Sequence, residues 1–251
     1  MDFNCLRGAY WERQIARVER VREQISSRLS IAHGRTIPDA EDLSIGKGRR
    51  LKAAIMFLDI SGFTSRPSES EEEQTNQLAA LNLFFSELIK IAEDYSGTVE
   101  KNTGDGLMVY FEDGGSDPPE NGSHRSVACA MTMFAASEAL INPILLRSGI
   151  APILFRICID HGYITIAKMG AARHFSAIVA IGTTANLASK MLSIAKSGEL
   201  LIGANVRSEL PCQWQDRWTT MHTYKSGWVF KSTKEPYSYY LFNGRWARVF
   251  E

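Results

Sequence analysis

Residues 57–64 read FLDISGFT, and residues 100–111 read EKNTGDGLMVYF. The first stretch ends a short, nearly continuous apolar run that begins at Ala53, the pattern of a strand covered on both faces. In the second stretch, the turn residues 102–104 separate two short strand-like segments, so we expect a hairpin. Asp59 lies at the end of the first strand and Asp105 at the tip of the hairpin. These two stretches predict the centre of the sheet.

The segments around them alternate between strand and helix patterns. Apolar residues recur at helical spacing over 78–92 and again over 127–140, where the helix is expected to end near Pro143. Residues 153–159 alternate as a strand, with a further strand over 163–168 after Gly162. The order β-α-β-β-α-β predicts a ferredoxin-like α+β core, a sheet with helices on one face. Later elements are expected as a strand over 175–181, a helix over 184–194, a strand over 198–202, and strands near 218–223 and 237–242.

The composition excludes several classes of protein. The chain has 28 Lys and Arg against 28 Asp and Glu, so bulk charge draws it neither to nucleic acid nor to an anionic membrane. No run approaches the roughly 18 apolar residues of a membrane span, and the first residues have no signal-peptide core. The four cysteines form no C-x-x-C pair, so no disulfide framework is expected. We expect a cytoplasmic protein with no nucleic-acid or membrane partner.

The two aspartates are candidate metal ligands. A β-α-β-β path brings the end of the first strand beside the hairpin, so the carboxylates of Asp59 and Asp105 are expected to converge. Converging carboxylates are typical of Mg²⁺ or Mn²⁺ sites, because these hard cations prefer oxygen ligands. The loop after Asp59 contains Gly62 and leads toward a helix, so its backbone N–H groups can cradle phosphate. Either aspartate alone would be read as a turn or cap, and the two together favour the metal site.

The two stretches resemble the class III adenylate/guanylate cyclase catalytic domain, and the likeness extends from about residue 51 to about residue 210. The resemblance implies a nucleotidyl cyclase domain over 51–251. Apolar periodicity over 9–30 predicts an N-terminal helix, and the Gly, Pro and charged residues after it indicate a linker, together residues 1–50. It implies two divalent ions, Mn²⁺ or Mg²⁺, on Asp59, the main chain of Ile60, and Asp105. The implied triphosphate-binding residues are Ser61, Gly62, Phe63 and Thr64.

The downstream stretch GTTANLASK (182–190) resembles the family motif that supplies an asparagine and an arginine from a partner subunit. Asn186 matches the asparagine. Lys190 stands where the family has arginine, which keeps the charge but loses the bidentate fork toward phosphate. The resemblance therefore implies that Asn186 and Lys190 are catalytic residues and that a homodimer shares its active sites.

Two positions concern the base. Lys101 matches the purine-recognising lysine of adenylate cyclases, whereas Val179 replaces an aspartate or threonine and cannot hydrogen-bond a base. With neither purine pattern complete, the chain resembles the bacterial pyrimidine cyclases of antiphage defence, the Pycsar systems. That resemblance implies conversion of UTP to cyclic UMP and pyrophosphate, as a second messenger for a downstream effector. Cytidylate or adenylate cyclisation and a non-catalytic nucleotide sensor of the same fold are the alternatives.

Three remaining patterns are expected to be structural. KSGWVFKSTK (225–234) interleaves lysines with Trp228 and Phe230, a pattern that suits nucleic-acid stacking. We expect a surface hairpin instead, and a lysine that reaches the γ-phosphate is the less favoured alternative. His161 and the other histidines have no metal-ligand spacing, so core or surface positions are expected. The acidic run over 68–73 is expected to start a solvated helix.

Overall fold

The computed structural model describes residues 16, 30–33, 43, 44, 46–102, 104–114, 121–172 and 175–246. Most of the expected helix over 9–30 and of the loop over 114–122 lies outside these residues. The chain divides into two compact units, residues 1–51 with 165–181 and residues 52–164 with 182–251. We call the first the N-terminal unit and the second the core unit.

The strands around Asp59 form as the sequence predicted. β2 (Lys47–Ile60) pairs antiparallel with β4 (Gly106–Glu112), which pairs with β3 (Thr98–Asn102), so the expected hairpin is confirmed. β5 (Phe155–Ala172) is the next neighbour of β2 in a sheet ordered β3-β4-β2-β5-β7-β9-β8. The βαββαβ order of an α+β fold is therefore confirmed.

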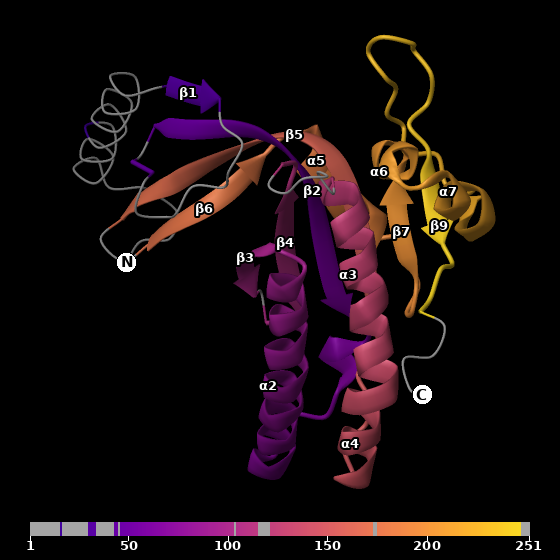
Figure 1. Cartoon of the computed structure of the whole chain (residues 1–251). Helices are drawn as coiled ribbons and strands as arrows, with labels where there is room; N and C mark the ends of the chain where they lie inside the picture. The colour runs from indigo at the N-terminus through magenta and orange to yellow at the C-terminus, as the bar shows by residue number, and fades with distance from the viewer. Residues whose placement is uncertain are drawn as a thin grey trace, which may run out of the picture. The chain divides into compact units, whose positions relative to one another are not determined.

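Two long helices lie side by side on one face of the sheet (Figure 1). α2 (Glu71–Asp94) begins with a capping box between Ser70 and Glu73, so the acidic run does start a helix. α3 (Gly122–Ala136) is capped by the Asn121 side chain. The inner faces of both helices and the strands β2, β4 and β5 form the main core. Each fully buried large apolar side chain there contributes about 1.5–3 kcal/mol to folding.

The helix after α3 continues through Pro143, where the sequence predicted a stop. A π-helical turn (η2, Ser137–Ile141) follows α3, and α4 (Asn142–Arg147) has the proline in its first turn. Proline is tolerated there because the first N–H groups of a helix have no intrahelical partner. The Asn142 side chain accepts from the Ile153 N–H and donates to its C=O, which fastens α4 to the chain before β5. The predicted helix end was wrong.

A second, smaller core lies on the other face of the sheet. α5 (Thr183–Leu192) packs there through Leu187 and Met191 against Cys158 of β5 and Leu201. Neighbouring residues of a strand point to opposite faces, so β5 contributes to both cores. The sequence predicted helices on one face alone, and α5 is the exception.

The C-terminal strands were expected, and two short helices between them were not. Helices of six or seven residues are too short for a clear apolar period, which is why the sequence did not reveal them. The elements are β7 (Leu200–Gly203), α6 (Ala204–Glu209), α7 (Cys212–Trp218), β8 (Thr219–Met221) and β9 (Tyr239–Phe242).

The N-terminal unit extends two strands of the core. β1 (Ser30–His33) pairs in parallel with the first four residues of β2, so residues 47–50 belong to a strand rather than to the predicted linker. β5 continues through Gly162 and pairs with β6 (Phe175–Ile181), so the predicted strand break was also wrong. A Cβ atom at position 48 would lie 2.8 Å from the Thr165 side chain, which is too close, so this position favours glycine.

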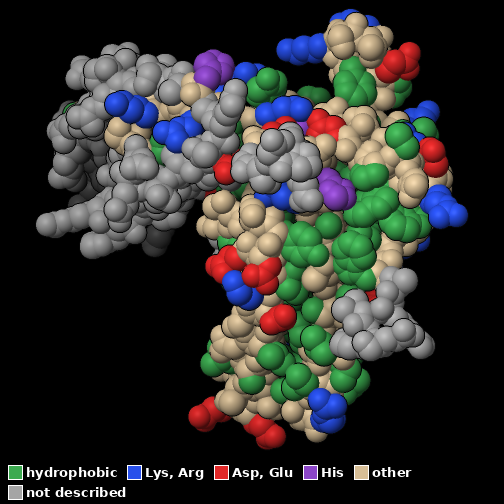
Figure 2. Space-filling model, in the orientation of Figure 1, with side chains coloured by type: hydrophobic (Ala, Val, Ile, Leu, Met, Phe, Trp, Pro, Cys, Tyr) green, Lys and Arg blue, Asp and Glu red, His purple; other side chains and the backbone are tan. Residues whose placement is uncertain are grey.

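Hydrophobic side chains gather over the helical face that Figure 2 shows. Leu140, Ile144 and Leu146 are the exposed apolar residues of η2 and α4. The continuous helical run Gly122–Arg147 has the length and hydropathy of a membrane span, with a window mean of 1.5. Most of α3 is nevertheless buried in the main core, so packing on the sheet accounts for its apolar character.

Candidate functional site

The two predicted metal-binding aspartates lie at neighbouring positions in the core unit. Asp59 pairs with Gly106 in the β2–β4 ladder, and the Ile60 N–H donates to the Asp105 C=O at 2.8 Å. The end of β2 is therefore fastened to the turn that carries Asp105. The Asp59 side chain is 23% exposed, so an ion can reach it from solvent. Two carboxylates and a nearby main-chain carbonyl are a donor set that fits Mg²⁺ or Mn²⁺.

Arg156, a residue that the sequence did not single out, contacts the first of these carboxylates. Its Nε and Nη2 atoms donate to Asp59 Oδ2 at 3.0 and 2.6 Å, and its Nη1 donates to the Ala195 C=O at 3.2 Å. Arg156 interrupts the apolar alternation of Phe155 and Ile157, which places it on the opposite face of β5. A guanidinium and a divalent ion would compete for the same carboxylate oxygen.

We expect Arg156→Gln to bind Mn²⁺ about fivefold more tightly than the unmodified chain in the absence of nucleotide. The substitution removes a cation that competes for Asp59, and a partly exposed ion pair contributes up to about 1 kcal/mol. Isothermal titration calorimetry measures the affinity. Lys90→Gln is the matched control, because it removes the same charge from an ion pair on the surface of α2. Unchanged or weaker binding by Arg156→Gln would contradict the expected competition.

The predicted phosphate loop follows directly. Gly62 has a φ of 67°, and a single 3-10 turn (η1, Phe63–Ser65) begins after it. The Ser61 N–H already donates to the Leu154 C=O, whereas the Ser61 Oγ is buried without a partner among the described residues. The Ser61 N–H is therefore already used, and the buried hydroxyl is the polar group of this residue that still lacks a hydrogen-bond partner in the part of the chain that the structure describes. Thr64 lies within the turn and is exposed.

The remaining predicted site residues lie on three other elements. Asn186 and Lys190 are one turn apart on α5 and both are exposed. Lys101 lies in β3, in the core unit, and pairs with Met108. Val179 lies in β6 and belongs to the N-terminal unit, so the joint role of Lys101 and Val179 stays a prediction.

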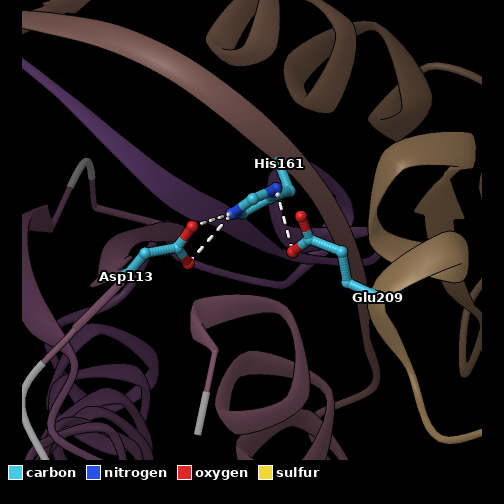
Figure 3. A group of neighbouring side chains, drawn as sticks. All are labelled: Asp113, His161 and Glu209. Carbon is cyan, nitrogen blue, oxygen red and sulfur yellow. Dashed lines mark hydrogen bonds and ion pairs between the residues drawn. The ribbon is translucent and has the colours of Figure 1, made fainter. Parts of the chain in front are cut away.

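A second group of titratable side chains, shown in Figure 3, joins three elements. His161 of β5 is buried, and its Nε2 lies 3.0 Å from both carboxylate oxygens of Asp113, which follows β4. Its Nδ1 lies 3.2 Å from Glu209 Oε2 of α6. His161 is buried, as expected for a core histidine, but its contacts with two carboxylates were not predicted. Lys52 completes it, because its Nζ lies 2.9 Å from Glu209 and 3.4 Å from Asp113.

The charged side chains of this group stabilise one another's ionised forms. Burial acts to lower the pKa of Lys52, but Glu209 and Asp113 outweigh it and raise that pKa above its usual value. Burial acts to raise the pKa of Asp113, but His161, the Gly122 N–H and Lys52 together outweigh it and hold that pKa below its usual value. A histidine with two carboxylates is a possible metal-binding set, yet the Lys52 ammonium already lies between the two acids. Lys52 and Asp59 are seven residues apart on β2, or about 20 Å.

A cavity of about 520 Å³ adjoins this group, with Lys52, His161 and Glu209 in its lining. Asp160 also lines it and is fully buried. Its Oδ1 accepts from the Tyr237 hydroxyl, and its Oδ2 has no partner among the described residues. Burial raises the pKa of Asp160 to about 7, and the Tyr237 hydrogen bond only partly opposes that rise.

We expect Asp160→Asn to stabilise the protein more strongly at pH 8 than at pH 5, where only about 2 kcal/mol of the gain is present. The folded state keeps the Asp160 proton up to about pH 7, whereas the ordinary pKa is 3.8. The unmodified protein therefore loses stability as the pH rises between those values, and asparagine cannot ionise. The gain above pH 7 is on the order of 4 kcal/mol.

Urea unfolding at both pH values measures this difference. Asp216→Asn, at an exposed carboxylate of α7, is the matched control and should show no pH-dependent gain. An equal effect of Asp160→Asn at pH 5 and pH 8 would show that Asp160 does not change its ionisation on folding.

Comparisons with known proteins agree with this fold. The profile of the family described as "Adenylate and Guanylate cyclase catalytic domain" matches residues 47–242. An adenylate cyclase from Anabaena cylindrica is 24% identical over 176 residues, which cover 68% of this chain and 33% of the relative. The guanylyl cyclase Cya2 has a TM-score of 0.63 at 21% identity, over 80% of this chain and 96% of the other. The adenylyl cyclase CyaB from P. aeruginosa has a TM-score of 0.62 at 27% identity, over 80% and 97%.

Because the family profile covers most of its length, this chain belongs to the adenylate and guanylate cyclase catalytic domain family. The solved cyclases share its fold, so the class III cyclase architecture expected from the sequence is confirmed. The chain spans 33% of the length of the curated relative that it matches.

Proposed function

We propose that this chain is a nucleotidyl cyclase that converts UTP to 3′,5′-cyclic UMP and pyrophosphate. The observation that carries the proposal is the pairing of the β2 end with the Asp105 turn, which sets two acidic residues side by side. Family membership supports cyclisation as the reaction class. The same proposal includes a cytoplasmic location of the protein, a role in antiphage defence and a downstream effector of the cyclic nucleotide.

The reaction is an internal displacement at phosphorus. The substrate's 3′-oxygen forms a bond to the α-phosphorus and loses its proton, while the bond from the α-phosphorus to the bridging oxygen breaks and pyrophosphate leaves with the electron pair. Two divalent ions, Mn²⁺ or Mg²⁺, held by Asp59, Asp105 and the Ile60 carbonyl, would supply charge neutralisation and acidify the hydroxyl.

The chain's own residues supply positioning and charge. The N–H groups of the turn after Ser61 are suited to hold phosphate oxygens, and the Ser61 hydroxyl lacks a hydrogen-bond partner among the described residues, which a phosphate oxygen could supply once it is reached. Asn186 is suited to orient the ribose through its amide. The Lys190 ammonium is suited to stabilise the negative charge that builds on the phosphoryl group. Catalysis would rest on positioning and electrostatics, as phosphoryl transfer generally does.

We also propose a homodimer with two shared sites. Asn186 and Lys190 are exposed on α5, where a second copy can reach them. A C2 dimer that sets α5 of one protomer against the Asp59 end of the other would form two equivalent sites.

UTP is expected to be the preferred substrate, followed by CTP, with purine nucleotides poor. Lys101 offers three donors and no acceptor, which suits the carbonyl oxygens of uracil. Val179 offers no acceptor for the amino group of adenine or cytosine, and an unpaired amino group costs on the order of 1–3 kcal/mol. Incubation with ATP, GTP, CTP and UTP in competition, with Mn²⁺ and mass detection of the products, measures the preference.

The outcomes of that competition separate two questions. A preference for ATP or GTP would contradict the pyrimidine assignment and leave cyclisation intact. Release of no pyrophosphate from any nucleotide would favour the alternative of a non-catalytic nucleotide sensor. Two departures from the family motif GDxVNxAxR within GTTANLASK (182–190) support that alternative: Lys190 replaces the arginine, and Thr183 replaces the usual aspartate.

A further inference from the structure

The ammonium of Lys190 has an aromatic neighbour. Lys190 lies in the last turn of α5, and its Nζ lies 5.3 Å from the centroid of the Trp228 ring. Across the described parts of the chain, this is the one ring contact, hydrogen bond or ion pair of that ammonium. The geometry is that of a cation–π contact, which holds a cation within about 6 Å of a ring centroid.

Trp228 is itself held in place. The backbone N–H of Trp228 donates to Ser226 Oγ at 3.1 Å, and its backbone C=O accepts from the Tyr237 N–H at 2.7 Å. The Ser226 hydroxyl donates to the Tyr237 C=O at 2.7 Å, which closes the base of the hairpin. The indole packs against the second core, which contains Leu187 and Met191 of α5. The ring is therefore fixed relative to the helix that carries Lys190.

A fixed ring can orient the Lys190 side chain, which is more flexible than the arginine that the family has at this position. An ammonium is a compact charge on a flexible four-carbon stem, whereas a guanidinium has a planar fork that is already oriented for phosphate. A lysine with no neighbour would spread its charge over many rotamers. The Trp228 face attracts the ammonium by about 0.5–1 kcal/mol at an exposed site, which narrows that distribution.

We propose that Trp228 is a positioning residue, which holds the Lys190 ammonium ready for the phosphoryl group. The inference rests on the proposed cyclase function and adds to it a residue outside the motifs that suggested that function. It also gives the interleaved segment over 225–234 a role in the chemistry rather than in nucleic-acid stacking.

A double-mutant cycle tests the proposal with Trp228→Leu, Lys190→Ala and the double variant. We expect Trp228→Leu to lower kcat about two- to fivefold with KM little changed, the fold-change that corresponds to the cation–π contact. In the Lys190→Ala background the same change should have no further effect, because there is no ammonium left to position. Trp228→Phe should retain most of kcat, since it keeps an aromatic face.

Tyr224→Leu is the matched control, because Tyr224 is an exposed aromatic residue directly before this segment and stacks on Tyr239 instead. It should leave kcat unchanged. An equal loss from Trp228→Leu in both backgrounds, or a loss from Trp228→Phe as large as from leucine, would overturn the positioning role.

A measurement without turnover separates this proposal from the cyclase assignment. The ε-methylene protons of Lys190 should resonate upfield of the other lysines in an NMR spectrum, through the ring current of Trp228, and should lose that shift in Trp228→Leu. If no nucleotide is cyclised but the shift is present, the proposed function fails while the contact stands. Absence of the shift overturns the positioning role even in an active enzyme.

Discussion

Asp59→Asn and Asp105→Asn are each expected to lower the rate of cyclisation at least about a thousandfold. Either change removes the charge that holds a divalent ion and keeps the size of the side chain. Asparagine at position 59 also leaves an acceptor for Arg156, so no cation is left without a hydrogen-bond partner. Pyrophosphate release with Mn²⁺ measures the rate, and thermal unfolding shows whether each variant is folded.

The control for this pair is Asp94→Asn. Asp94 is an exposed carboxylate on α2 whose partner is Lys90, so its loss should leave the rate unchanged. More than about a tenth of the normal rate in a folded Asp59 or Asp105 variant would remove both residues from the proposed metal site.

Mixing inactive Asp59→Asn with inactive Asn186→Ala is expected to restore about a quarter of the activity. If the site is shared, each mixed dimer has one site with two defects and one site with none. Random exchange gives about half mixed dimers, each with half of the normal sites. The rate is measured after the two variants are unfolded and refolded together, with differently tagged chains to confirm that mixed dimers form.

The matched control is a mixture of Asp59→Asn with Asp105→Asn. These residues belong to the same half of the proposed site, so both sites of the mixed dimer stay defective and no activity should return. If verified mixed dimers of Asp59→Asn and Asn186→Ala regain no activity, both residues belong to the site of one protomer, and the proposal of shared sites is wrong.

The part of the site that could be predicted is the part built from neighbouring segments. A turn sequence between two apolar runs predicted the β3–β4 hairpin, and the order of elements set that hairpin beside the end of β2. The register then follows from which face of each strand is apolar. Asp59 and Asp105 could therefore be expected to meet.

The ion pairs of Asp59 and of His161 could not be predicted, because each joins residues far apart in the chain. Arg156 and Asp59 are separated by 97 positions, and His161 and Asp113 by 48. A charged residue in an alternating strand shows only that one face is polar. Which charge it meets depends on the strand order and on helices, such as α6, that are too short to be seen in the sequence.

The start of β2 was misread for a related reason. The residues KGRR (47–50) are basic and contain a glycine, a composition typical of loops. They form a strand because β1 provides hydrogen-bond partners and because Gly48 allows the close approach of Thr165. The sequence of an edge segment does not reveal the partner that makes it a strand.

The continuity of β2 and β5 determines how the chain can be shortened. Residues 47–51 of β2 and 165–172 of β5 belong to the N-terminal unit, while the same two strands carry Asp59 and Arg156 in the core unit. A fragment that begins at residue 52 would cut β2 in mid-strand and leave the retained residues 165–172 of β5 without that part of their neighbouring strand. Because the two units share β2 and β5, neither can be exchanged without cutting a strand. A recombinant fragment or a chimaeric fusion should therefore keep β2 whole, with its junction before Lys47.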